Sequence, residues 1–122
     1  DALPIFKAKN LNENKWVKGS LIKTPFGTFI EWYNNSICNR EKVYSHTVCQ
    51  FTGLTDCENN AIYEGDIIRN PEFPFEKRTV IWDNNSSCFA LVDIDGCKDR
   101  DLSLSVLFDK WIVVGNKFGD EK

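Results

Sequence analysis

Short runs of apolar residues alternate with clusters of Asn, Asp, Gly and Pro along the whole chain. Runs of this length, bounded by turn-forming residues, are typical of β-strands rather than of helices. The pattern predicts eight or nine strands and no helix beyond a single turn within 99–110. The predicted strands cover residues 5–8, 15–23, 28–33, 43–51, a segment beginning at 67, then 79–82, 88–94, 102–107 and 111–114.

Turn residues join several of these strands into hairpins. Pro25 and Gly27 bracket a tight turn, so residues 15–33 are predicted to form a hairpin. The sequence DNNSS joins two further apolar runs in the same way. The polar stretch 34–42 and the Asn- and Asp-rich stretch 52–60 are predicted to be a loop and a turn cluster.

The spacing of strands and turns predicts a mainly β fold with little helix. Residues 62–114 have the length and layout of a five-stranded SH3-like barrel. The first half is predicted to be a β-meander packed against that barrel. We therefore expect a single domain over residues 1–122, made of a meander lobe (1–48) and a barrel-like lobe (49–122).

Composition supports strands over helices. The 122 residues include 24 Val, Ile and Thr and 16 aromatic residues, but only 4 Ala, 8 Leu and no Met. β-Branched and aromatic residues favour strands, whereas Ala, Leu and Met favour helices. No apolar run approaches the ~20 residues of a membrane-spanning helix. We therefore expect a protein of the cytoplasm with no membrane association.

The charged and sulfur-containing residues exclude several kinds of site. The net charge is −3, so a role that depends mainly on binding nucleic acid phosphates is disfavoured. The five cysteines form no CxxC pair, and His46 is the only histidine, which argues against a zinc site. Free thiols in a reducing cytosol are the simplest interpretation. We expect no metal and no cofactor.

The segment that follows the predicted meander carries a family signature. It reads QFTGLTDCENNAIYEGDIIR at Gln50–Arg69 and resembles the signature of the YopX family of phage and prophage proteins. Supporting similarities lie at Phe6–Ile22, Val80–Leu91 and Val113–Gly119. The turn CENN and the tail after Gly119 depart from the family pattern. The resemblance implies a mostly β, barrel-containing protein of phage origin, with no established catalytic residue or cofactor.

Most of the signature residues are predicted to be structural. Gly65 permits a backbone conformation that other residues resist, and Glu64 or Asp66 can accept hydrogen bonds from a turn. Thr52 or Asp56 can likewise cap a loop. Two alternatives remain open: a ligand pocket framed by residues 50–54, and a hydrolase that uses Glu64 and Asp66. The whole signature set is Gln50, Phe51, Thr52, Gly53, Leu54, Asp56, Tyr63, Glu64, Gly65 and Asp66.

A second candidate site is a surface that combines lysine and tryptophan. Residues 1–23 carry a net charge of +3, against −6 for the remainder of the chain. The residues of this possible interaction surface are Lys7, Lys9, Lys15, Trp16, Lys18 and Trp82. Buried packing is the simpler role for the tryptophans, but small barrels can also stack bases on aromatic side chains.

These observations predict a non-enzymatic accessory protein that acts by macromolecular binding. A protein partner or self-association into a homo-oligomer ranks first, because the chain is acidic and rich in aromatic residues. A nucleic-acid-binding small barrel is the second hypothesis, and the hydrolase is the third.

Overall fold

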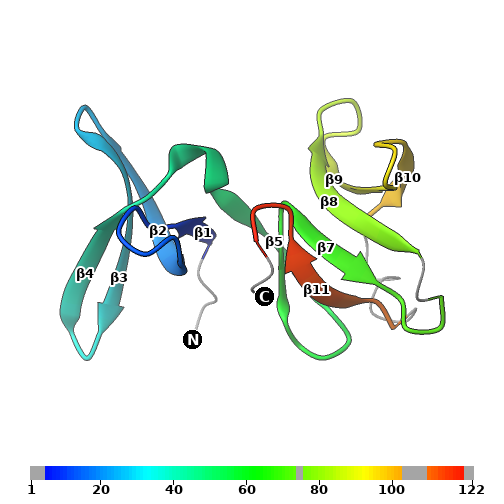
Figure 1. Cartoon of the computed structure of the whole chain (residues 1–122), viewed down its shortest axis with the longest axis horizontal. Helices are drawn as coiled ribbons and strands as arrows, with labels where there is room; N and C mark the ends of the chain where they lie inside the picture. The colour runs from blue at the N-terminus through cyan, green and yellow to red at the C-terminus, as the bar shows by residue number, and fades with distance from the viewer. Residues whose placement is uncertain (1–4, 74–75, 103–109, 120–122) are drawn as a thin grey trace. The chain divides into compact units, whose positions relative to one another are not determined.

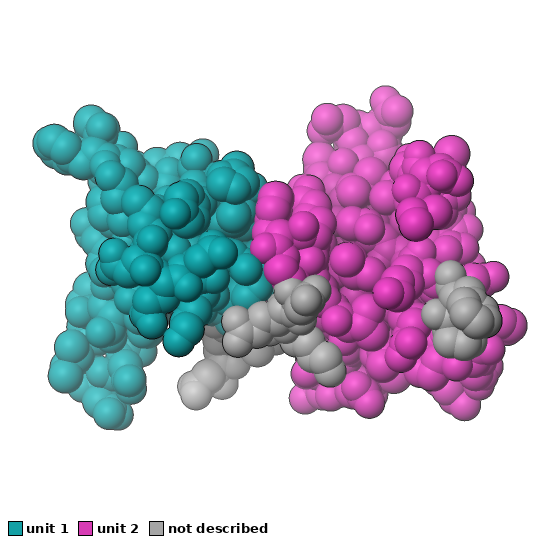
Figure 2. All heavy atoms as spheres, in the orientation of Figure 1, with its two compact units in different colours: residues 1–51 teal, residues 52–122 magenta. Residues whose placement is uncertain are grey.

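The computed structural model describes residues 5–73, 76–102 and 110–119, which fold almost entirely into antiparallel β-strands. The predicted mainly β class is confirmed, and the described residues contain no α-helix. They divide into two compact units, residues 1–51 and 52–122, coloured separately in Figure 2. No helix among the described residues is long and apolar enough to cross a membrane.

The first unit is an antiparallel sheet ordered β4-β3-β2-β1-β5 (Figure 1). Strand β5 begins here, where its Cys49 and Gln50 pair with β1, and it ends in the second unit. A short 3-10 helix precedes β5. The elements are β1 (Phe6–Lys9), β2 (Trp16–Thr24), β3 (Gly27–Asn34), β4 (Ile37–Lys42), the 3-10 helix (Ser45–Thr47) and β5 (Cys49–Thr55).

The core of the first unit lies on one side of this sheet. Ala8, Ile30 and Val43 are at most 4% exposed. The partly buried residues that pack against them are Phe6, Val17, Leu21, Trp32 and Val48. Because side chains alternate between the two sides of a strand, the residues next to these in β1–β4 point to the other side.

Gly19 lies where two strand backbones approach each other closely. A Cβ atom at this position would meet the carbonyl oxygen of Glu31 at 2.2 Å. Strand β2 turns from its pairing with β1 to its pairing with β3 at this point, because Gly19 pairs with Phe6 and Ser20 pairs with Glu31. Position 19 therefore has room for a glycine only.

The second unit is built around a five-stranded sheet ordered β10-β9-β8-β7-β11. The end of β5 and the short strand β6 pair with each other. The bounds are β6 (Ala61–Tyr63), β7 (Asp66–Arg69), β8 (Lys77–Asp83), β9 (Cys88–Val92), β10 (Lys98–Asp101) and β11 (Ile112–Asn116). Its core is a cluster of Ile62, Ile68, Val80, Leu91, Trp111 and Val113.

Several fold predictions need correction. Residues 45–47, predicted as part of a strand, form a 3-10 helix, and residues 52–55, predicted as part of a turn cluster, belong to strand β5. The described strands of the second unit form an open sheet with β10 and β11 at its ends, so the predicted closed SH3-like barrel is not found. Residues 37–42, predicted to be loop, form strand β4, because their backbone pairs with that of β3 at a sheet edge. The strand predicted at 102–107 falls largely outside the described residues. Where the helical turn was predicted within 99–110, residues 99–101 belong instead to strand β10, and residues 103–109 lie outside the described residues.

Candidate functional site

Asp56 of the signature is buried and makes four hydrogen bonds. Its Oδ1 accepts the backbone N–H groups of Glu58, at 2.9 Å, and Asn60, at 2.8 Å. Its Oδ2 accepts the Val113 N–H at 2.9 Å and the Asn60 side-chain amide at 3.2 Å. The carboxylate therefore caps the turn between β5 and β6 and ties that turn to β11.

The Asp66 carboxylate holds the turn between β6 and β7 in the same way. Its Oδ2 accepts the Tyr63 N–H at 2.8 Å, and its Oδ1 accepts the Asn116 side-chain amide at 2.9 Å. Gly65 adopts a φ of 87° within this turn. Burial, and after it the charge of Asp66, raises the pKa of Tyr63 to about 12. Glu64 lies beside this network and is partly exposed.

The other signature residues belong to strand β5. Thr52 donates its hydroxyl to the Ile62 carbonyl at 2.7 Å, and Leu54 packs against the core of the second unit. Gly53 has a φ of 86° with no atom near its missing Cβ. Gln50 is exposed, and Phe51 is partly exposed. Residues 50–54 thus form a strand, and none of them lines the pocket described below.

The side of the first sheet that faces away from the core is rich in cations and rings. We call it the outer face. It holds Lys7, Lys9, Trp16, Lys18, Ser20, Ile22, Phe29, Glu31, Tyr33, Cys38, Arg40 and Lys42, as the strand registers and alternation place them. Five of these twelve residues are basic and one is acidic, so this face has a charge opposite to that of the whole chain.

Cations lie against the aromatic rings of the outer face. The Lys9 Nζ lies 5.5 Å from the centroid of the Trp16 ring, and the Arg40 guanidinium lies 5.7 Å from that of Phe29. Arg40 also donates two hydrogen bonds to the Glu31 carboxylate, the shorter at 2.7 Å. Tyr33 is 69% exposed, and its hydrogen bond with Cys38 raises its pKa.

The structure corrects one residue of the predicted lysine and tryptophan surface. Lys7 is fully buried, with its Nζ 4.8 Å above the Trp16 ring, so it is not a surface residue. Lys9 and Trp16 are partly exposed and Lys18 is exposed on the same face. Lys15 lies just before β2, where it pairs with Glu13 at 3.4 Å.

Trp82 belongs to the second unit. It is 44% exposed, and its ring meets that of Phe89 edge to face with centroids 5.1 Å apart. Its indole N–H donates to the Asn84 side chain at 2.9 Å. Trp82 therefore packs on its own hairpin between β8 and β9.

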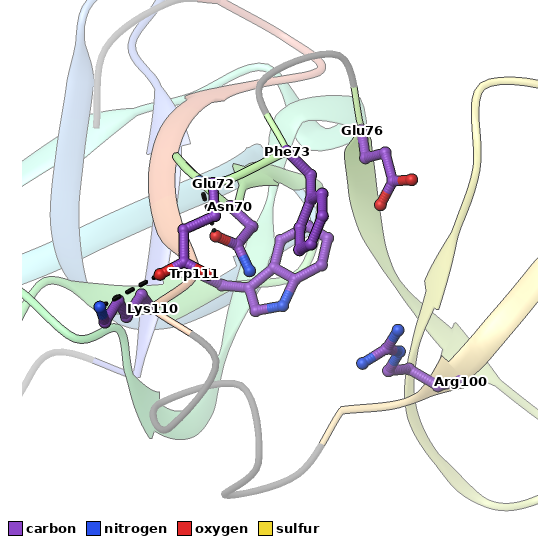
Figure 3. Close-up of a pocket in the computed structure, with 7 residues that line it drawn as sticks. All are labelled: Asn70, Glu72, Phe73, Glu76, Arg100, Lys110 and Trp111. Carbon is purple, nitrogen blue, oxygen red and sulfur yellow. Dashed lines mark hydrogen bonds and ion pairs between the residues drawn. The ribbon is translucent and has the colours of Figure 1, made fainter.

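The second unit has a pocket of about 300 Å³, drawn in Figure 3. Buried Trp111 lies at its base, and Phe73, which is 55% exposed, forms part of its wall. The complete lining is Asn70, Glu72, Phe73, Glu76, Arg100, Lys110 and Trp111. The volume is at the lower end of the range for sites that hold a small molecule or a single side chain.

Charges of both signs surround the pocket. The Lys110 ammonium pairs with the Glu72 carboxylate at 3.1 Å. The Arg100 guanidinium lies 5.9 Å from the centroid of the Trp111 ring and pairs with Asp99 at 3.2 Å. Asn70, which is 5% exposed, accepts the Glu72 N–H through its Oδ1 at 3.0 Å.

Sequence patterns did not identify the pocket, and they identified only four of the twelve outer-face residues, Lys7, Lys9, Trp16 and Lys18. The pocket residues come from separate loops and strand ends, so no local spacing joins them. Arg40 and Lys42 were missed because residues 34–42 are predicted to be a loop. The sequence did carry one signal for this face: Phe29, Glu31 and Tyr33 alternate with Ile30, which is buried on the other side of the strand.

The described cysteines and acidic residues do not form a metal site. All five cysteines are free thiols, as predicted, with Cys49 buried and Cys38, Cys57 and Cys97 exposed. Within the ranges that the structure describes, no group of three or more His, Cys, Asp or Glu side chains could hold a metal ion.

The comparisons with known proteins agree with the sequence signature. A family model described as YopX protein matches residues 5–120, nearly the whole chain. No curated protein matches the chain. The family match confirms the resemblance that residues 50–69 predicted.

Proposed function

We propose that this chain, which belongs to the YopX family, is a non-enzymatic protein that acts by binding another protein. The resemblance further favours a phage or prophage accessory protein that works in the cytoplasm of a bacterium. The hydrogen bonds of the signature support binding over catalysis. Asp66 uses both carboxylate oxygens to hold a turn and a neighbouring strand, which disfavours a hydrolase that pairs it with Glu64.

The pocket of the second unit is the observation that carries this proposal. Its base is aromatic, while its rim carries the acidic Glu72 and Glu76 and the basic Arg100 and Lys110. Residues 52–122 contain eight basic and fourteen acidic residues, a net charge of −6. A polyanion would be repelled by such a unit, whereas a protein can offer an apolar side chain to the base and charges of both signs to the rim.

The test compares partner capture by variants of the full chain. The tagged protein is expressed in cells that make it naturally, and captured proteins are identified with and without nuclease treatment. Phe73→Ala removes an exposed ring at the pocket. Ile94→Ala is the matched control, because Ile94 is a 96% exposed apolar residue of the same unit that does not line the pocket.

We expect a nuclease-resistant partner that binds the wild-type chain and Ile94→Ala, and that Phe73→Ala loses. The purified partner should then bind with at least about fivefold weaker affinity to Phe73→Ala, as for an interface residue worth more than ~1 kcal/mol. Equal capture by both variants would contradict the pocket as the site. Recovery of the same chain alone, supported by a concentration-dependent mass in sedimentation, would identify the partner as a second copy.

A further inference from the structure

We infer that the outer face of the first unit binds single-stranded nucleic acid. This inference is independent of the pocket, because it concerns a different unit and different residues. Residues 1–51 contain seven basic and four acidic residues, a net charge of +3. The first unit, which holds the outer face, therefore has the charge that attracts a polyanion. The second unit, which holds the pocket, has the opposite charge.

The strand registers place cations beside rings on this face. Lys9 pairs with Trp16 across β1 and β2, and Phe29 pairs with Lys42 across β3 and β4. Tyr33 lies on the same side of β3 as Phe29, about 13 Å away along the strand at ~3.3 Å per residue. An antiparallel sheet thereby holds three rings and their neighbouring cations on one surface.

Lys42 gives this face an exposed positive charge. Glu31 is its only carboxylate among the described residues, and Arg40 already pairs with it at 2.7 Å. Lys42 is exposed and makes no ion pair with a described residue. Lysine and arginine neutralise phosphates, which gives affinity that falls as salt rises.

The exposed ring favours a single strand over a duplex or an acidic polypeptide. Tyr33 presents a planar surface that is 69% exposed. Unpaired bases stack on such rings whatever their sequence, whereas paired bases in a duplex do not present their faces. An acidic polypeptide would satisfy the cations but would have no general use for the rings. A single-stranded nucleic acid uses both.

The test measures fluorescence anisotropy of a labelled thymidine oligonucleotide, the matching duplex and polyglutamate with the full-length chain over a series of salt concentrations. Two substitutions remove groups of the outer face, Lys42→Ala and Tyr33→Ala. Each has a matched control. Lys23 is an exposed lysine that points to the opposite side of β2, and Phe26 is an 82% exposed ring in the turn between β2 and β3.

We expect the single strand to bind at low salt, with Tyr33→Ala weakening it at least about fivefold, as for the loss of one stacked base. Lys42→Ala should reduce the steepness of the salt dependence by roughly 0.7, the contribution of one phosphate contact on a single strand. Lys23→Ala and Phe26→Ala should bind as the wild type does. Thermal unfolding of each variant establishes that the fold is intact.

Three outcomes would overturn the inference. The first is the absence of binding at low salt. The second is equal weakening by Lys42→Ala and Lys23→Ala, which would indicate attraction to net charge alone. The third is that the duplex or polyglutamate binds as tightly as the single strand and depends equally on Lys42. The face would then be a site for anions in general.

Discussion

The Asp56 carboxylate accepts a 2.9 Å hydrogen bond from the backbone N–H of Val113, 57 residues further along the chain. Both residues are at most 2% exposed. The bond joins the turn of the family signature to the last strand. Asp56 of the signature therefore connects distant segments of the second unit.

Substitution of Asp56 should therefore destabilise the fold. Asp56→Ala leaves the buried Val113 N–H and the amides of the turn without their acceptor. We expect the free energy of unfolding to fall by roughly 2–3 kcal/mol, because hydrogen bonds to charged groups are worth about 1.5–3 kcal/mol. Urea denaturation measures it. Asp95→Ala, in an exposed turn, is the control and should stay within about 0.5 kcal/mol of wild type; equal losses would refute the structural role.

Gly19→Ala should also destabilise the protein, through crowding rather than a lost bond. The added Cβ would lie 2.2 Å from the Glu31 carbonyl oxygen, a backbone atom that cannot move without shifting β3. We expect a loss of roughly 1–3 kcal/mol in the same urea experiment, the range for overpacking. Ser20→Ala at the adjacent exposed position is the control. A neutral or stabilising Gly19→Ala would show that the two strands are further apart.

Tyr63 should ionise at a higher pH than an ordinary tyrosine. Burial and the Asp66 charge raise its pKa to about 12. The folded state thus holds the phenol proton more tightly than the unfolded chain, whose tyrosines titrate near pH 10. The resulting stability is present below pH 10 and is lost as pH rises through 12.

Ultraviolet absorbance of the phenolate during an alkaline titration follows this ionisation. Tyr63→Phe should remove the late step, whereas Tyr44→Phe should leave it in place. Asp66→Asn should lower the pKa of Tyr63, because it removes the neighbouring charge. Ionisation of Tyr63 near pH 10 in the native chain would contradict its buried position.

Acid should weaken the hairpin that carries Asp83. Hydrogen bonds from Ser86 and Lys98, the former the larger cause, lower the pKa of Asp83 to about 2. Its charged form is therefore favoured by folding, so this contribution is present above pH 4 and is lost as pH falls from about 4 to about 2. Lys98 also holds the pKa of Asp101 below its usual range.

The measurement for this prediction is the urea midpoint between pH 5 and pH 2. Lys98→Ala should flatten the pH dependence, because both carboxylates lose a partner. Lys117→Ala, in the turn after β11, is the control and should keep the wild-type profile. Identical profiles for wild type and Lys98→Ala would show that the Lys98 pairs form equally in the unfolded chain.

Local patterns predicted the strands better than their assembly. The apolar runs at 15–23 and 28–33 became β2 and β3, because their alternation needs only neighbouring residues. Strand β4 was missed because it is polar and lies at a sheet edge, where no buried side is required. The pocket was missed because Asn70, Arg100 and Trp111 meet only when separate loops and strands come together.

The sequence by itself determined a mainly β chain, its hairpins, its free thiols and its membership of the YopX family, since these depend on composition, spacing and motif. Tertiary structure alone decided that Lys7 is buried while Tyr33 is exposed. It alone decided that the carboxylates of Asp56 and Asp66 accept hydrogen bonds from the distant strand β11. It also decided that the sheet of the second unit stays open in the described residues. The reason is physical: burial, register and long-range hydrogen bonds depend on which segments meet, and no local pattern specifies that meeting.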